Sequence, residues 1–497
     1  MHKKWLILLP AFAALSLCAF SQTPAASPAP VSAETRAAVS RLVGDIMVNG
    51  QNYEYDRQLA DTIGPRLTAS ANYERAVAWA QQQFKQIGVT NVHTEPFTMP
   101  AAWEPEVPAV GKMTAPRIQQ LHIYSMGWSP STPSAGVKGD VYYCSRMVPA
   151  GSLDGAKIRG KVVLLDRASI TGTAMAGLAP FSQILDSFRK LHELGAQAVI
   201  FPGNTNGSES ASAFTFTGEL SPLPVAQLGR EDELLIKRLL DAGLPVQVEF
   251  SFKNRIRENV ATENVVAEIK GSAEPDSIVI VGGHLDSWHP GTGAQDNGTG
   301  ATGVMEVARA VQALAAPPRR TMRFILFGGE EEGLVGSTAY SKAHRDEMSK
   351  IDAVIITDTG SEQAKGFYLM GRNDEKSAME PYEPLLAGLG GDKTTDDVEF
   401  MFQSDHAGME MMGVPELVLW TDTTKYFKLH HKASDTFDSV DQHDFTQGVS
   451  VLAATSYAIA DSAEPFAKHL SQEQVEGMLK DVKQLETYED MRKLGVF

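Results

Sequence analysis

Residues 324–337, FILFGGEEEGLVGS, join a run of apolar residues to two glycines and three consecutive glutamates. Adjacent like charges repel, and no basic residue within the stretch neutralises them. An apolar run of this length predicts a buried strand, and the glycines allow the backbone to turn where that strand ends. Glu330, Glu331 and Glu332 are therefore predicted to lie at a strand end where cations neutralise some of their charge.

Four continuous apolar runs of strand length, this one included, alternate with helical stretches such as residues 303–314. Continuous rather than alternating apolarity is typical of strands buried on both faces, as in a mostly parallel sheet covered by helices. The sequence therefore predicts an α/β catalytic domain over residues 256–497, ending in a charged helical tail from Ser471. The four runs are residues 276–283, 321–329, 351–358 and 415–422.

The chain before residue 256 divides into four predicted parts. Residues 1–21 have the basic start, apolar run and small-residue cleavage site of a secretory signal peptide, so we expect an exported protein, secreted or periplasmic. Residues 22–48 are predicted as a flexible leader. Residues 49–128 form the N-terminal part of the catalytic domain, with a helix over 72–87. Residues 129–255 have a different, glycine-punctuated pattern that predicts an inserted α+β domain.

Composition excludes some classes of partner. The 497 residues carry a formal net charge of −17, which argues against binding nucleic acid or an anionic membrane. The signal sequence is too short for a membrane span, and none is predicted. Cleavage of the signal peptide leaves Cys144 as the single cysteine, so no internal disulfide is expected. The sequence leaves the oligomeric state open, with a homodimer as one alternative.

Residues suited to bind metal follow each predicted strand. The carboxyl ends of parallel strands meet at one edge of a sheet, so these side chains are expected to converge. Two histidines with three carboxylates are the nitrogen and oxygen donor set expected for zinc, and the excess of carboxylate suits two ions that share a ligand. The residues from which such a set would be drawn are, in chain order, His284, Asp286, Asp296, Glu330, Glu331, Asp358, His430 and His431.

The motifs HLDSW, GAQDNGTGATG and FGGEEEGLVGS, together with Asp358 and HHKASDT, resemble those of the zinc exopeptidases of peptidase family M28. The resemblance implies a phosphorylase/hydrolase-like fold, in which the inserted domain is similar to a protease-associated domain. It also implies two zinc ions and a hydroxide nucleophile held between them. By this resemblance, His284 and Asp358 hold one zinc, Glu331 and His431 hold the other, Asp296 bridges both, and Glu330 is the general base.

Five other residues are weaker candidates. Asp286 is expected to hydrogen-bond His284 and fix its tautomer. His430 stays open as a ligand in place of His431, although the spacing to the following Asp-Thr pair favours His431. His406 lies in a segment expected near the substrate, and Tyr426 is a candidate to stabilise the oxyanion. Arg372 is a candidate to bind a substrate carboxylate.

The resemblance further implies short peptide substrates, above all dipeptides with both termini free. The metal core does not decide the direction of cleavage, because the same ions and base serve both kinds of exopeptidase. A carboxypeptidase or dipeptidase is the preferred prediction, with an aminopeptidase as the alternative. A one-zinc, glutaminyl-cyclase-like enzyme is a further alternative, and a non-catalytic relative is disfavoured because no ligand position is replaced.

Overall fold

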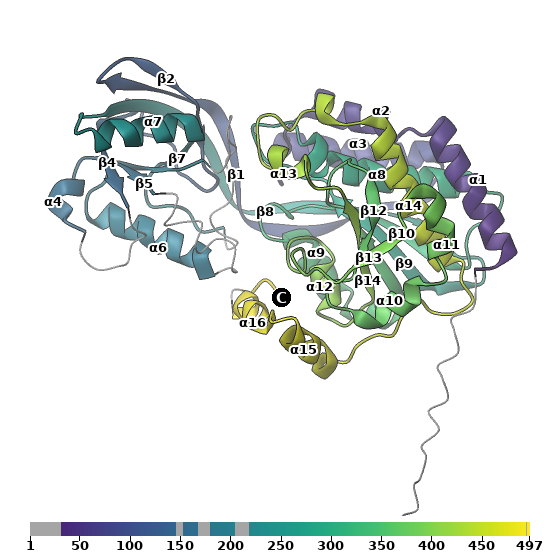
Figure 1. Ribbon diagram of the computed structural model, residues 1–497. Coiled ribbons are helices and arrows are strands. Elements are labelled where there is room, and N and C mark those ends of the chain that lie inside the picture. Colours follow the sequence, from purple (N-terminus) through teal and green to yellow (C-terminus); the bar gives the residue numbers. More distant parts are fainter. Residues whose placement is uncertain (1–30, 146–152, 167–178, 204–217, 494) are drawn as a thin grey trace, which may run out of the picture.

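The computed structural model describes residues 31–145, 153–166, 179–203, 218–493 and 495–497. It has a larger and a smaller lobe, joined by the long strands β1 (Asn91–Ala115) and β8 (Gln247–Ile269) (Figure 1). These two strands pair in antiparallel fashion along nearly their whole length and run from one lobe into the other. The signal peptide predicted for residues 1–21 lies outside the described residues.

The larger lobe is built on a mixed sheet with the strand order β13-β12-β14-β11-β9-β10-β8. Its four central strands, β14, β11, β9 and β10, are parallel to their neighbours within this group, and they correspond to the four apolar runs. The prediction of a mostly parallel sheet covered by helices is confirmed. The strands are β9 (Glu274–His284), β10 (Arg320–Phe327), β11 (Ile351–Ile356), β12 (Ala364–Tyr368), β13 (Lys393–Thr395) and β14 (Glu416–Thr421).

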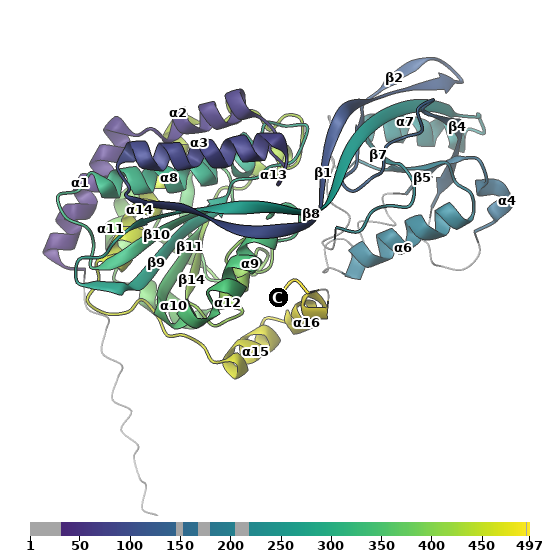
Figure 2. The same ribbon diagram turned by 180° about the vertical axis from the view of Figure 1, so that it is seen from behind.

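Helices cover both faces of this sheet, with α3, α8 and α14 on one face and α9, α10 and α12 on the other (Figure 2). Strand β9 buries Val279 and Val281 in one apolar core and Ile278 and Ile280 in a second. This two-sided burial explains why the strand lacks polar alternation. The helices are α1 (Ala33–Asn49), α2 (Asn52–Arg57), α3 (Ala71–Ile87), α8 (Thr299–Gln312), α9 (Val335–Ala343), α10 (Asn373–Met379), α11 (Glu383–Leu386), α12 (Ala407–Glu410), α13 (Tyr426–Leu429), α14 (Gln442–Ala460), α15 (Gln472–Asp481) and α16 (Leu485–Lys493).

The smaller lobe contains the parallel strands β4, β5, β6 and β7, with β3 antiparallel to β7 at one edge. Its likeness to a protease-associated domain stays a prediction. Its elements are β2 (Gln119–Leu121), β3 (Ile123–Ser125), β4 (Val137–Cys144), α4 (Gly155–Ile158), β5 (Val162–Leu165), α6 (Ala179–Glu193), β6 (Ala198–Phe201), β7 (Val225–Leu228) and α7 (Arg230–Asp241).

Helix α1 occupies much of the stretch predicted as a flexible leader over residues 22–48. Ser32 caps its N-terminus by accepting the backbone N–H of Thr35, and Leu42 and Ile46 are each 1% exposed. The Thr35 hydroxyl donates to Asp461 at the end of α14. The leader prediction is therefore wrong from Ala33 onward, because an apolar stripe anchors this segment to the larger lobe.

The smaller lobe also begins earlier than the predicted boundary at residue 129. Met113 on β1, Leu121 and Ile123 share one apolar core with strands of that lobe. Four prolines between residues 96 and 108 obscured the length of β1, since proline usually ends a strand. Register shifts between Pro105 and Val110 accommodate some of them.

Among the described residues, no helix combines the length and apolar character needed to cross a membrane.

Candidate metal centre

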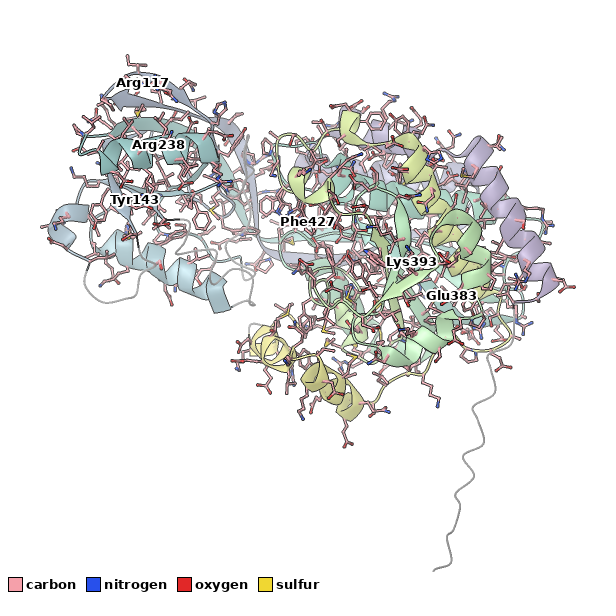
Figure 3. All side chains as sticks on the ribbon, in the orientation of Figure 1. Arg117, Tyr143, Arg238, Glu383, Lys393 and Phe427 are labelled. Carbon is pink, nitrogen blue, oxygen red and sulfur yellow. The ribbon has the colours of Figure 1, made fainter. Side chains whose placement is uncertain are left out.

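The predicted donors converge at the carboxyl edge of the larger sheet. His284 is the last residue of β9, Asp358 follows β11, and the glutamates follow β10. Asp296 lies in η2 (Ala294–Gly298), in the connection between β9 and α8, and His431 follows the short helix α13. Helix α13, which carries Phe427, lies on the side of the larger lobe that faces the smaller lobe (Figure 3). The donors therefore come from several strand ends, as the parallel sheet predicts.

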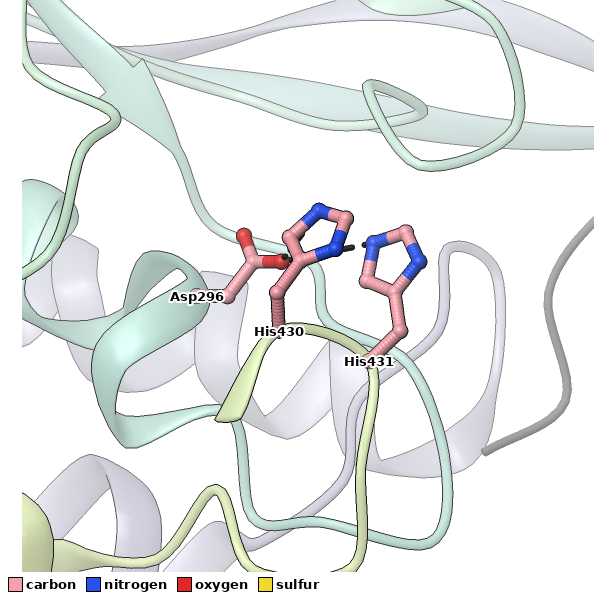
Figure 4. Close-up of side chains that lie close together, drawn as sticks. All are labelled: Asp296, His430 and His431. Atoms are coloured by element: carbon pink, nitrogen blue, oxygen red, sulfur yellow. Dashed lines mark ion pairs between the residues drawn. The ribbon is translucent and has the colours of Figure 1, made fainter. Parts of the chain in front are cut away.

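Asp296 lies between the two histidines predicted as ligands. Its Oδ1 is 3.3 Å from Nε2 of His284, and its Oδ2 is 3.3 Å from Nε2 of His431. Asp296 is 4% exposed, and Figure 4 shows its carboxylate beside the imidazoles of His430 and His431. One carboxylate that offers one oxygen to each imidazole neighbourhood has the geometry of a bridging ligand.

The first donor group consists of His284, Asp296 and Asp358, whose candidate ligand atoms all lie within 4.8 Å of one another. Nε2 of His284 is 3.1 Å from Oδ1 of Asp358. On the other side of the ring, Nδ1 is 3.1 Å from the backbone carbonyl oxygen of Asp286, whereas the carboxylate of Asp286 is 3.6 Å away. A carbonyl accepts, so Nδ1 carries a proton, and Nε2 is the nitrogen that would bind metal once metal displaces its own proton.

Asp286 thus contacts His284 through its backbone carbonyl, and its carboxylate lies near the same ring nitrogen. Its carboxylate oxygen Oδ2 accepts the backbone N–H of Glu331 at 3.2 Å. Asp286 therefore links the end of β9 to the turn after β10, and the two strand ends hold one another in position.

The three glutamates face three different partners. Oε2 of Glu330 is 3.8 Å from Nε2 of His284, and Oε2 of Glu331 is 2.8 Å from Nε2 of His431. Glu332 turns away and accepts the backbone N–H of Thr68 at 3.0 Å. The backbone turns because Gly329 and Gly333 adopt φ angles of +73° and +108°, which side chains disfavour. Neighbouring glutamates can therefore reach different groups despite the alternation of a strand.

Burial raises the pKa of each glutamate carboxyl group. The pKa of Glu330 is raised well above its usual value by burial and by the charges of Asp358 and Glu331, against the opposing effect of His284. Burial likewise raises the pKa of Glu331 to about 7, although His431 opposes the shift. Clustered, desolvated carboxylates of this kind are stabilised by a bound cation.

The second donor group places both consecutive histidines near Asp296. Atoms of Asp296, His430 and His431 lie within 4.8 Å of one another, and Nε2 of His430 is 3.5 Å from Oδ2 of Asp296. The two imidazole rings stack with centroids 3.7 Å apart. His431 alone also reaches Glu331, which favours it as the ligand. His430 stays open as the alternative, as the sequence left it.

The weaker candidates have different outcomes. Tyr426 is buried, its ring lies 5.3 Å from that of His430, and its pKa is raised well above the usual value by burial and by carboxylates of the centre. His406 is also buried, but its Nε2 faces Glu410 at 3.9 Å, and the structure does not bring it into either donor group. For the neighbouring residue Asp405, burial raises the pKa, and the charge of His284 opposes this shift.

Two positioning residues were missed by sequence reasoning. Asp435 accepts the backbone N–H groups of Gln295 at 2.7 Å and of Asp296 at 3.1 Å, so it holds the loop that carries the bridging carboxylate. Trp288 donates its backbone N–H to Oε1 of Glu331 at 3.3 Å, and its ring lies 6.1 Å from that of His431. Asp435 belongs to the Asp-Thr pair whose spacing was used to choose between His430 and His431. That motif could also have indicated a role for Asp435 itself.

The described donors fit a metal centre on chemical grounds. The groups combine imidazole nitrogens with carboxylate oxygens, the donor atoms lie close together, and Oδ2 of Asp296 is buried without a hydrogen-bond partner among the described residues. A parallel sheet with such a centre at its carboxyl edge, beside a buried carboxyl of raised pKa, defines a metal-dependent hydrolase.

Comparison with known proteins agrees with this class. The model of "Peptidase family M28" matches residues 264–456. Carboxypeptidase Q from Bos taurus is 31% identical over 442 residues, covering 86% of this chain and 89% of that protein. Aminopeptidase YwaD from Bacillus subtilis is 23% identical over 415 residues, covering 82% of this chain and 83% of that protein. The chain therefore belongs to peptidase family M28 and is a metallopeptidase.

Solved structures share the fold over most of the chain. A peptidase M28 precursor from Shewanella amazonensis matches with a TM-score of 0.75 at 24% identity, covering 88% of this chain and 99% of that one. A zinc aminopeptidase from Bacillus subtilis matches with a TM-score of 0.62 at 19% identity, covering 85% and 97%. At these identities the structures show the shared fold.

Proposed function

We propose that the protein is an exported exopeptidase with two zinc ions that hydrolyses dipeptides or short peptides as a carboxypeptidase or dipeptidase. The observation that carries the two-ion proposal is Asp296, whose two carboxylate oxygens lie 3.3 Å from the ring nitrogens of His284 and His431. A single ion would leave one of these imidazoles without a metal partner. The proposed ligands are His284 and Asp358 for one ion, Glu331 and His431 for the other, and Asp296 for both.

The bound zinc ions would polarise the scissile carbonyl and lower the pKa of the attacking water. Glu330 is proposed to take the proton from that water and to pass it to the leaving amine. This role suits a largely buried carboxyl whose pKa is raised above its usual value, because a raised pKa makes the carboxylate a stronger base. Tyr426 is proposed to donate a hydrogen bond to the oxyanion, since its buried hydroxyl stays protonated.

The direction of cleavage rests on the similarity to carboxypeptidase Q, which exceeds that to the aminopeptidase. The prediction that Arg372 binds a substrate carboxylate is wrong. Arg372 is 1% exposed and donates to the backbone carbonyls of Val414 and Lys468, while its remaining contacts go to Asp374 and Glu375. A guanidinium committed to these partners has no donor left for a substrate carboxylate. An aminopeptidase of the same family stays the second candidate, and a one-zinc, glutaminyl-cyclase-like enzyme ranks third.

Three substrates test the direction of cleavage: a free dipeptide, its N-acetyl form and its C-terminal amide. We expect the free dipeptide to be cleaved and the amide to resist, since an enzyme that grips a terminal carboxylate loses that contact on amidation. Resistance of the acetylated form as well would indicate a strict dipeptidase. Released amino acids are measured by chromatography.

The matched control is the Glu330→Gln variant purified in the same way, because it reveals any contaminating peptidase. Resistance of the acetylated form alone, with cleavage of the amide, would show an aminopeptidase and contradict the proposed direction.

A further inference from the structure

The segment 64–70, GPRLTAS, joins η1 (Gln58–Ile63) to α3 and lies nearly 200 residues before the part of the chain that matches the family model. It nevertheless contacts loops that carry proposed ligands of the metal centre. Arg66, within this segment, is completely buried. We call residues 64–70 the ligand strap, because of the contacts described next.

Arg66 holds together the loop between His284 and Asp296. Its guanidinium donates to the backbone carbonyls of Leu285, of Thr292 at 2.8 Å and of Gly293 at 2.9 Å. Leu285 directly follows the first ligand, and Gly293 lies three residues before the bridging one. One rigid, planar group therefore ties the start of the loop to its end, which sets the separation of the two ligands.

Thr68 holds the other ligand-bearing turn. Its hydroxyl accepts the backbone N–H of Gly329 at 2.7 Å, and its own backbone N–H donates to Oε1 of Glu332 at 3.0 Å. These two residues flank Glu330 and Glu331. The strap thus contacts two of the loops that carry proposed ligands, through Arg66 and Thr68, which lie two residues apart.

Arg66 also places a positive charge beneath a cluster of acids. Its guanidinium hydrogen bonds go to backbone carbonyl groups. The neighbouring carboxylates therefore interact with its charge electrostatically, without a hydrogen bond. Burial lowers the pKa of Arg66, and four carboxylates oppose this shift; they belong to Asp56, Asp435, Asp286 and Asp296. An arginine keeps its charge in such a site, so it offsets part of the repulsion that the centre carries before metal binds.

We propose that the ligand strap sets the geometry of the metal centre, with Arg66 as the positioning residue that fixes the spacing of His284 and Asp296. The proposal rests on the metal centre proposed above. It assigns to a segment outside the matched region of the family a direct effect on metal affinity.

The variant Arg66→Lys tests this proposal. Lysine keeps the charge but cannot bridge three carbonyl groups with a fixed planar fork. We expect zinc affinity, measured by competition with a chromogenic chelator, to fall about 10- to 100-fold, as it does when groups that orient ligands are altered. The matched control is Arg372→Lys, since Arg372 is equally buried and also donates to two backbone carbonyls, yet contacts neither ligand loop.

Both variants are expected to lower Tm in the metal-free form, but only Arg66→Lys should weaken zinc binding. Wild-type affinity in Arg66→Lys, or an equal loss in Arg372→Lys, would overturn the proposal.

Thr68→Val provides a second test that keeps the side-chain shape. It should weaken zinc binding and lower kcat more than it alters KM, and unchanged values of both would count against the strap. Titration of the wild-type protein separately tests the proposed metal centre.

Discussion

Replacing Glu330 by glutamine is expected to lower kcat by about 10²- to 10⁴-fold, the usual contribution of a general acid–base group. Glutamine keeps the size of the side chain but cannot accept the proton of the attacking water. Zinc content should stay unchanged, because Glu330 is 3.8 Å from His284 and is not required as a ligand in the proposed set. Steady-state kinetics on a free dipeptide and elemental analysis of the same sample measure both quantities.

Glu331→Gln is the matched control, one residue further along the chain. Glu331 lies 2.8 Å from the ring of His431, so its loss should weaken the binding of one metal ion. Activity of this variant should rise when excess zinc is added, whereas that of Glu330→Gln should not. If the two variants exchanged these behaviours, the assignment along the three glutamates would be wrong by one residue.

Removal of metal is expected to abolish activity completely, and added zinc or cobalt should restore it. The reason is that, in the proposed mechanism, bound metal would lower the pKa of the attacking water, whereas the residues of the centre would supply only ligands and proton transfer. Activity is measured after exhaustive dialysis against a chelator, with a sample dialysed without chelator as the control. Full activity in protein shown to contain no metal would contradict the metallopeptidase mechanism.

Acid should weaken zinc binding and, through it, the peptidase activity. In the metal-free centre, burial lowers the pKa of His431, but the carboxylates of Glu331 and Asp296 outweigh it and raise that pKa to about 10. Zinc must displace this proton to bind, so its apparent affinity should fall as the pH falls. A chelator competition repeated across several pH values measures the effect.

Much of the centre could be predicted from sequence because His284, Asp358 and the glutamates each follow an apolar run. The strands of a parallel sheet end at one edge, so a residue directly after such a run has a known position. The glycines beside Glu330 also indicated the turn that separates the three glutamates. Local pattern was therefore sufficient for His284, Asp358 and the glutamates.

Contacts between distant segments could not be predicted in this way. Arg66 donates to a carbonyl 219 residues away, and Thr68 accepts an N–H from 261 residues away. Nothing in the periodicity around these residues indicates such partners. Arg372 was misjudged for a related reason, because buried contacts with its own neighbours occupy its guanidinium.

The most direct test of the two-metal centre is the number of zinc ions per chain. Protein is loaded with excess zinc, desalted, and analysed by mass spectrometry for metal and by amino-acid analysis for protein. Because Asp296 lies within 3.3 Å of both histidines, we expect two zinc ions per chain. A value of one zinc ion per chain in fully active protein would contradict the bridged centre.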